Sequence, residues 1–165
     1  VTHDQEEAMS LSDRMAIMKN GLILECSSPE EIYENPKSIY TANFIGIANI
    51  IEIYKKDENF YSDDLGINFK LNKELSNTKT NILLRPEKIK IQSVNNLKVS
   101  SFNSFYGEIL EKSYLGSFTR YEIKINKMII SVLDQNFNSK SNYNFPKGEK
   151  VICSWESESI KILED

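Results

Sequence analysis

His3 is the only histidine in this chain of 165 residues, so it is the one imidazole that the chain could use for chemistry. A histidine triad or a multi-histidine metal site within the chain is therefore excluded. Two cysteines, Cys26 and Cys153, stand far apart in the sequence and form no CxxC motif. We expect neither a zinc ribbon nor a disulfide scaffold, and we predict no metal site.

Familiar catalytic motifs are absent from the sequence. It contains no GxxxxGK[ST] phosphate loop, no GxGxxG, no HExxH and no GxSxG. Carboxylate pairs such as Asp63-Asp64 are typical of solvated faces. Taken alone, the residues favour a structural or surface histidine at position 3 over a catalytic one, and they leave open whether this chain by itself is an enzyme.

Composition and charge narrow the class of protein. Hydrophobic residues make up 40% and charged residues 27% of the chain, which suits a globular fold and excludes wholesale disorder. No apolar run approaches the ~20 residues that span a bilayer. Residues 1–48 carry 3 basic and 8 acidic side chains, and residues 49–165 carry 17 and 16, so the net charges are −5 and +1. Neither part has a strongly basic face, so we expect no nucleic-acid partner.

The elements that must position His3 are short helices and a hairpin. Residues 1–3 are interpreted as the end of a strand, and Asp4 as the cap of a helix with Glu7 completing a capping box. Asn20-Gly21 between two apolar runs predicts a β-hairpin. Ser28, followed by Pro29 and Glu31, predicts a second helix. A third helix over about 38–45 is expected to end with Gly46 as a left-handed cap.

After Gly46 the apolar residues recur at every second position. This alternation, with Asn, Asp, Gly and Ser between the runs, predicts eight to ten short half-buried strands. The strands indicate a small antiparallel barrel or a pair of them. We therefore predict an α+β chain with a boundary near Gly46 to Asn49. Residues 1–48 would be an α/β remnant, and residues 49–165 would be an all-β barrel region of the OB type.

Particular runs of this sequence closely resemble the ATP-binding subunits of ATP-binding cassette importers. Residues 1–14, VTHDQEEAMSLSDR, resemble the switch-histidine segment, and residues 28–36, SPEEIYENP, with 42–46, ANFIG, look like the end of the nucleotide-binding domain. In the second part, matches to the family's TOBE regulatory domain are LRPE at 84–87, GEI at 107–109, YLGSFTRY at 114–121, GEKV at 148–151 and SW at 154–155. The run at 114–121, with DQN at 134–136, is most similar to the spermidine/putrescine importers.

The resemblance implies a role for His3 as the switch histidine that contacts the ATP γ-phosphate. It also implies ATP and Mg²⁺ as cofactors of the intact parent subunit, a transport ATPase. The phosphate loop, signature motif and Walker B segment of the family lie upstream of this switch segment, and none is present. We therefore expect the chain to be the C-terminal part of such a subunit, and to bind neither cofactor tightly on its own.

Partners and location also follow from the resemblance. It implies a homodimer of ATPase subunits, transmembrane permease subunits and a periplasmic or surface substrate-binding protein. The expected location is the cytoplasmic side of the bacterial inner membrane, as a peripheral protein. Regulatory or structural candidates in the barrel region are Arg85, Glu87, Tyr114, Arg120 and Trp155. For each, a structural role is favoured: Arg85-Pro86-Glu87 would fix a strand entry, and Trp155 would lie in the core.

An alternative of a different class is a freestanding OB-type ligand-binding or dimerisation module with no ATPase role. Aromatic side chains of OB barrels can stack bases or sugars. A platform of this kind could be formed by Phe102, Phe105, Tyr106, Phe118 and Tyr121. The near-neutral charge of residues 49–165 and the N-terminal segment, which such a module would not need, count against it.

Overall fold

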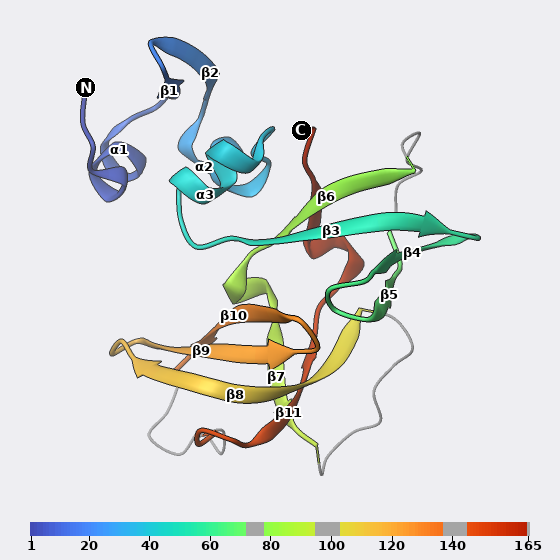
Figure 1. Ribbon diagram of the computed structural model, residues 1–165. Coiled ribbons are helices and arrows are strands. Elements are labelled where there is room, and N and C mark those ends of the chain that lie inside the picture. Colours follow the sequence, from blue (N-terminus) through green and yellow to red (C-terminus); the bar gives the residue numbers. More distant parts are fainter. Residues whose placement is uncertain (72–77, 95–102, 137–144, 165) are drawn as a thin grey trace.

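The structure is a computed structural model that describes residues 1–71, 78–94, 103–136 and 145–164 (Figure 1). Within these ranges the N-terminal unit, residues 1–48, consists of short helices and one hairpin, and the remainder is mostly strand. The elements of the N-terminal unit are α1 (Gln5–Leu11), β1 (Met15–Lys19), β2 (Leu22–Ser27), α2 (Pro29–Glu34) and α3 (Ile39–Phe44). The strands that follow are β3 (Asn49–Lys56), β4 (Asn59–Ser62), β5 (Ile67–Phe69), β6 (Lys79–Leu84), β7 (Lys90–Ser93), β8 (Ser104–Tyr114), β9 (Phe118–Ile125), β10 (Met128–Gln135), β11 (Lys150–Ser154) and β12 (Ile160–Ile162).

Side-chain caps begin all three helices. Asp4 Oδ1 accepts from the Glu7 backbone N–H at 3.0 Å, and Ser28 Oγ accepts from Glu31 N–H at 3.3 Å. Ser38 caps α3 in the same way, accepting from Thr41 N–H at 3.1 Å. Each bond satisfies one of the backbone donors that a helix leaves free at its start. The predicted caps at positions 4 and 28 are confirmed.

The predicted hairpin is confirmed, with β1 and β2 paired antiparallel. Asn20 and Gly21 have φ of 53° and 79°, the two positive values that a type I′ turn requires. A register shift after Ile17 makes Met18 and Ile23 direct cross-strand partners.

Two local expectations are wrong. Residues 1–3 form no strand, because a strand needs a paired neighbour and no described strand lies beside them. Gly46 is not a left-handed cap: its φ is not positive, and α3 ends at Ile45 with right-handed helical angles. The glycine instead lies beside Tyr33 and Arg85, where an added Cβ would come within 3.5 Å and 3.8 Å of their side chains.

Two five-stranded antiparallel sheets enclose one core, which resolves the choice between one barrel and two in favour of one (Figure 1). Their strand orders are β12-β6-β3-β4-β5 and β10-β9-β8-β11-β7. Side chains of both sheets meet in that core, among them Ile53 and Phe69 from the first and Ile109 and Tyr121 from the second. We refer to this β-structure, from residue 49 onward, as the barrel.

The chain passes from one sheet to the other through two short 3-10 turns. The first, η1 (Pro86–Lys88), joins β6 to β7, and the second, η2 (Ser157–Ser159), joins β11 to β12. Asn49 also bridges the sheets: its Nδ2 donates to Ser131 O and its Oδ1 accepts from Ser131 N–H, both at 2.8 Å. Since Asn49 lies on β3 and Ser131 on β10, one side chain provides the pairing that the backbones do not.

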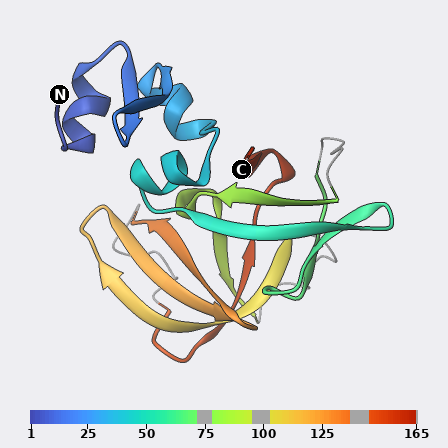
Figure 2. The same ribbon diagram turned by 45° about the horizontal axis from the view of Figure 1, so that its top comes forward.

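The N-terminal unit lies against one end of the barrel, beside β6 and the C-terminal segment (Figures 1 and 2). Ala42 of α3 packs with Leu83 of β6 and with Leu163, and all three are at most 2% exposed. No helix in the described ranges is both long enough and apolar enough to cross a bilayer.

Candidate functional site

His3 lies at the surface, immediately before the capped start of α1. In the described part of the chain its imidazole has no hydrogen-bond partner, whereas its neighbours Thr2 and Asp4 are joined by a 3.0 Å bond from Asp4 N–H to Thr2 Oγ1. Because the ring is exposed and makes no described hydrogen bond, both of its nitrogens are available to bind a ligand. Asp4 is occupied as the helix cap.

Arg85 lies at the junction of the N-terminal unit and the barrel, and it is only 3% exposed. Its Nη1 donates to Ala42 O at 2.9 Å and Ile47 O at 3.2 Å, and its Nη2 donates to Tyr33 O at 3.1 Å. The guanidinium also stacks 4.2 Å from the centre of the Tyr33 ring. Burial lowers the pKa of Arg85, and Tyr33, Glu87 and Glu34 counteract this. The residue therefore joins two parts of the chain and has few donors left for a ligand.

Glu87 belongs to the same junction. It accepts from the Tyr33 hydroxyl at 2.9 Å, and next to it Lys88 Nζ lies 3.0 Å from Glu34 Oε1. Burial, and then the hydrogen bond to Glu87, raise the pKa of Tyr33 to about 12. The sequence interpretation of Arg85-Pro86-Glu87 as a strand entry is thus incomplete, because Arg85 and Glu87 also hold α2 and α3.

The other barrel candidates do not join this cluster. Tyr114, at the end of β8, is 73% exposed. Arg120 lies on β9 with its Nε 3.8 Å from Glu122 Oε1. Trp155 is 5% exposed and packs against Phe69 and Phe105, with ring centroids 5.6 Å and 5.4 Å apart, as expected of a core residue.

The cysteines behave differently from each other. Cys153 is fully buried in the core, and burial raises the pKa of its thiol. Cys26 is exposed on β2 and accepts a long hydrogen bond from Arg14. Within the described ranges, no group of three or more His, Cys, Asp or Glu side chains is arranged to hold a metal ion.

The described aromatic residues do not assemble the platform that a nucleic-acid-binding OB barrel would use. Phe105 and Tyr121 point into the core with 3% and 1% exposure, while Tyr106 is 58% exposed on the outside. Phe102 lies outside the described residues. The five residues could not form one platform because side chains alternate along a strand. Phe105 and Tyr106 are consecutive on β8, so they face opposite sides of the sheet.

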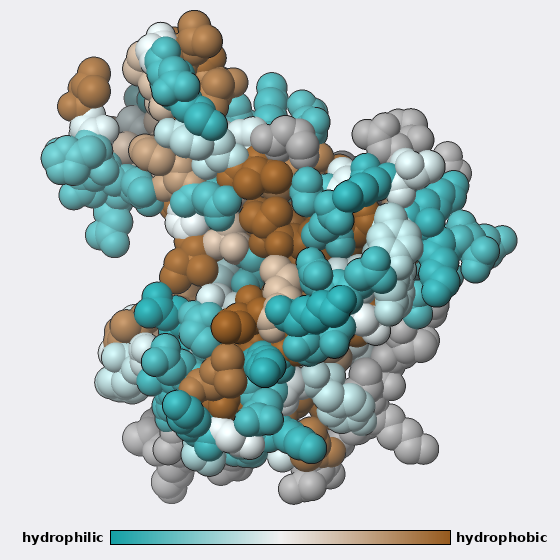
Figure 3. Space-filling view, viewed as in Figure 1, coloured by the Kyte–Doolittle hydropathy of each residue, from teal (hydrophilic) through white to brown (hydrophobic). Residues whose placement is uncertain are grey.

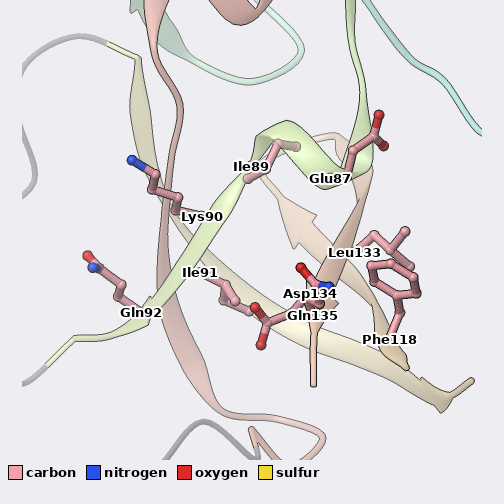
Figure 4. Close-up of a pocket in the computed structure, with 9 residues that line it drawn as sticks. All are labelled: Glu87, Ile89, Lys90, Ile91, Gln92, Phe118, Leu133, Asp134 and Gln135. Carbon is pink, nitrogen blue, oxygen red and sulfur yellow. The ribbon is translucent and has the colours of Figure 1, made fainter. Parts of the chain in front are cut away.

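A cleft of about 340 Å³ lies between β7 and β10, the two edges of the second sheet (Figure 4). Phe118, Leu133, Asp134 and Gln135 line one wall, and η1 with β7 forms the other, including Glu87. Burial raises the pKa of Asp134. The Asp134 carboxylate and the Phe118 ring make this cleft suitable for a small cation, and the Glu87 carboxylate, which accepts from the Tyr33 hydroxyl, adds negative charge beside it.

Lys90, the positive side chain at the edge of the cleft, is directed elsewhere. Its Nζ lies 3.2 Å from Glu156 Oε1, and Figure 4 shows it projecting from β7 away from Asp134. The cleft therefore keeps its acidic character.

Sequence reasoning missed Tyr33, Lys37 and Asp134. The partners of Tyr33 lie 52 and 54 residues further along the chain, and Lys37 takes part only through its backbone. No short-range sequence pattern predicts contacts between residues so far apart in the chain. Asp134 stood within a run singled out by resemblance, but its place at a sheet edge follows only from the strand order.

A family model described as the TOBE domain matches residues 82–163. The spermidine/putrescine import ATP-binding protein PotA of Thermotoga maritima is 33% identical over 173 residues, covering 99% of this chain and 47% of that protein. PotA of Vibrio vulnificus is also 33% identical, covering 100% and 45%. The putrescine transport ATP-binding protein PotG of Escherichia coli K12 is 33% identical over 172 residues, covering 99% and 45%. The chain thus spans about half the length of the curated relatives it matches.

A solved structure shares the barrel fold. The cytoplasmic molybdate-binding protein ModG, crystallised with molybdate bound, superposes with a TM-score of 0.58 over 71% of this chain and 96% of its own. The sequence identity is 6%, so the likeness concerns the fold alone. It agrees with the OB-like barrel expected from the strand pattern.

Proposed function

We propose that this chain, which belongs to the family of TOBE-containing ATP-binding subunits of polyamine importers, works as the C-terminal part of one that couples ATP hydrolysis to uptake of spermidine or putrescine. The observation that carries the proposal is the 33% identity to such subunits along 99% of the chain. The TOBE model matches only part of the barrel, so on its own it would assign no function to residues 1–48.

His3 supplies the contact to the terminal phosphate in this proposal. An imidazole at an exposed position can donate to a γ-phosphate oxygen when ATP is bound, and it loses that partner after hydrolysis. The exposed side chain and the absence of a described hydrogen bond support this role, because no internal contact has to be broken first. The cap formed by Asp4 fixes the start of α1 immediately behind the ring.

The remaining components of the site belong to the parent subunit. ATP and Mg²⁺ would be held by residues outside this chain, together with a second ATPase subunit that closes on the nucleotide. Permease subunits and a substrate-binding protein complete the proposed importer, which places the chain at the cytoplasmic face of the membrane. The barrel acts as the regulatory and dimerisation part.

A chimera tests the assignment. The chain is fused behind the part of the Thermotoga maritima relative that precedes its matching region, and Mg²⁺-dependent ATP hydrolysis is measured. We expect turnover by the chimera and none by the isolated chain. His3→Ala should lower the turnover about 100-fold, the loss typical of removing one donor to developing charge.

Asp4→Asn is the matched control, since asparagine caps helices as well as aspartate does. It should retain the turnover of the unmodified chimera. Equal activity of the His3→Ala chimera would refute the role of His3. Turnover by the isolated chain would refute the proposal that the chain depends on an upstream part.

A second candidate function, ligand binding by the barrel itself, is favoured by the cleft between β7 and β10. Asp134 and Glu87 provide negative charge there, and Phe118 offers a ring face to an ammonium group. The ligand class that matches this chemistry is a small organic amine, and the relatives named for spermidine and putrescine suggest a polyamine.

Calorimetric titration of the isolated chain with spermidine tests this candidate. Asp134→Asn should weaken binding, whereas Glu58→Gln in the exposed β3–β4 turn should not. A single-stranded oligonucleotide provides the comparison ligand, and we expect no salt-dependent binding because the barrel lacks a basic face. Oligonucleotide binding without spermidine binding would support the freestanding OB module instead.

A further inference from the structure

Residues 29–48, which we call the coupling segment, have two buried faces. On one side Ile32 and Ile45 pack with Met15 and Ile17 of β1. On the other, Ala42 packs with the barrel through Leu83 and Leu163. In the described part of the chain, the hydrogen bonds and ring contacts of residues 1–28 all end within residues 1–48. Every such link between residues 1–28 and the barrel therefore runs through the coupling segment.

Arg85 is the main polar bond between the coupling segment and the barrel. Its three carbonyl acceptors belong to Tyr33 near the end of α2, to Ala42 of α3 and to Ile47, three residues after α3. Hydrogen bonds from a charged donor contribute more than neutral ones, and these lie in a site where Arg85 is 3% exposed. The planar guanidinium reaches the three carbonyls from two separate nitrogens, whereas a lysine would offer one ammonium nitrogen on a flexible stem.

The peptide groups flanking the Lys37 α-carbon form a second link. Lys37 N–H donates to Glu25 Oε1 at 2.8 Å, and Lys37 O accepts from Glu164 N–H at 2.9 Å. Glu25 lies on β2 of the hairpin, and Glu164 follows β12 of the barrel. The backbone of one residue thus connects the unit that carries His3 to the C-terminal segment of the barrel.

We propose that the coupling segment moves as one body with the barrel. Arg85 is then the positioning residue that sets how residues 1–28, which include His3, are oriented relative to the barrel. The sequence predicts a domain boundary near Gly46 to Asn49, and Ala42, Ile47 and Lys37 are hydrogen-bonded to the barrel across it. A displacement of either part is then transmitted through α2 and α3. A role of this coupling in regulating ATP hydrolysis rests on the proposed function. The rigid connection between the coupling segment and the barrel does not depend on it.

Distance measurement between two spin labels tests the coupling in the full 165-residue chain. One label is attached to the native Cys26, which is exposed, and the other to Lys124→Cys near the end of β9, an interior strand of its sheet. Cys153 is fully buried and stays unlabelled. We expect one narrow distance distribution for the otherwise unmodified chain, and a broadened and shifted one for Arg85→Lys.

Arg120→Lys is the matched control, because it removes an arginine from the barrel outside the junction, and it should leave the distribution narrow. Trp155 fluorescence reports independently that the core is folded, since this single tryptophan packs between Phe69 and Phe105. If Arg85→Lys fails to fold, Tyr33→Leu replaces it. That variant removes the ring under the guanidinium and should also broaden the distribution.

An unchanged distribution in a folded Arg85→Lys chain would overturn the proposal. The same holds for an unchanged distribution in Tyr33→Leu where Arg85→Lys does not fold. The measurement uses no nucleotide and no polyamine, so a failure of the proposed function leaves its outcome untouched, and the reverse is also true.

Discussion

Gly107 occupies a position in β8 where the neighbouring strand leaves no room for a side chain. An added Cβ would overlap Ile123 Cγ2 and would lie 3.3 Å from both Ile125 Cγ1 and Lys124 O. Those atoms belong to β9, and Ile123 is fully buried. The need for glycine therefore comes from the close approach of two strands.

Gly107→Ala should lower the free energy of unfolding by about 1–3 kcal/mol, the usual cost of forcing extra volume into a packed core. Urea denaturation followed by Trp155 fluorescence measures it. Gly46→Ala is the control: its Cβ would meet Tyr33 and Arg85 at ordinary contact distances, so a change within about 0.5 kcal/mol is expected. Equal losses in the two variants would contradict the packing argument.

Tyr33 gives the junction a dependence on alkaline pH. Its pKa is raised to about 12 by burial and by the bond to Glu87, compared with about 10 in an unfolded chain. A group whose pKa is higher in the folded state stabilises fully below its unfolded pKa. That contribution is lost as the pH rises from 10 through 12.

The free energy of unfolding should therefore fall less between pH 10 and pH 12 in Tyr33→Phe than in the unmodified chain. Urea denaturation at pH 8, 10, 11 and 12 gives the two profiles. Tyr114→Phe, at a residue that is 73% exposed, is the control variant and should follow the unmodified chain. Parallel profiles for Tyr33→Phe and the unmodified chain would show that the phenol at the junction is not responsible.

At the scale of elements, strands and helix starts were predictable because their causes are local. The alternation of Tyr121, Ile123 and Ile125 with polar residues placed all three in the core. The caps at Asp4 and Ser28 depend on residues three positions away. By contrast, the acceptors of Arg85 lie 38 to 52 residues earlier, so its role as a junction required the folded chain.

Closure of the barrel also depends on a contact that no sequence pattern predicts. Asn49 exchanges two hydrogen bonds with the backbone of Ser131, 82 residues away, and it is 5% exposed. The bonds join the first sheet to β10 of the second. An apolar replacement would leave the N–H and C=O of Ser131, in a partly buried position, without these partners.

Asn49→Ala should consequently lower the free energy of unfolding by about 1–3 kcal/mol, the cost of leaving buried polar groups unsatisfied. Asn68→Ala, at an exposed position of β5, is the matched control and should change it by less than about 0.5 kcal/mol. Thermal unfolding monitored by circular dichroism distinguishes the two. A small effect at Asn49 would mean that water or a shifted backbone replaces its bonds.

At the scale of the whole molecule, the two parts differ in charge and in exposed apolar surface. The N-terminal unit carries 8 acidic and 3 basic side chains, a net of −5, while residues 49–165 carry +1. The same unit exposes Leu22 by 68%, Ile23 by 62% and Met18 by 51%, and Figure 3 shows hydrophobic residues on the lobe that projects from the barrel. Exposed apolar groups gathered on one element favour association, whereas the excess negative charge opposes it.

These opposing terms predict that the isolated chain self-associates through the hairpin, and more strongly at high salt, because salt screens the repulsion between the acidic units and leaves the apolar attraction intact. Sedimentation velocity at several protein concentrations, in low and high salt, measures the effect. Ile23→Lys should reduce association at both salt concentrations, since it places a charge beside Met18, its cross-strand partner. Ile129→Lys, at a residue 54% exposed on β10, tests the barrel surface and should leave association unchanged. If Ile129→Lys abolished association and Ile23→Lys did not, the barrel sheet and not the hairpin would be the contact.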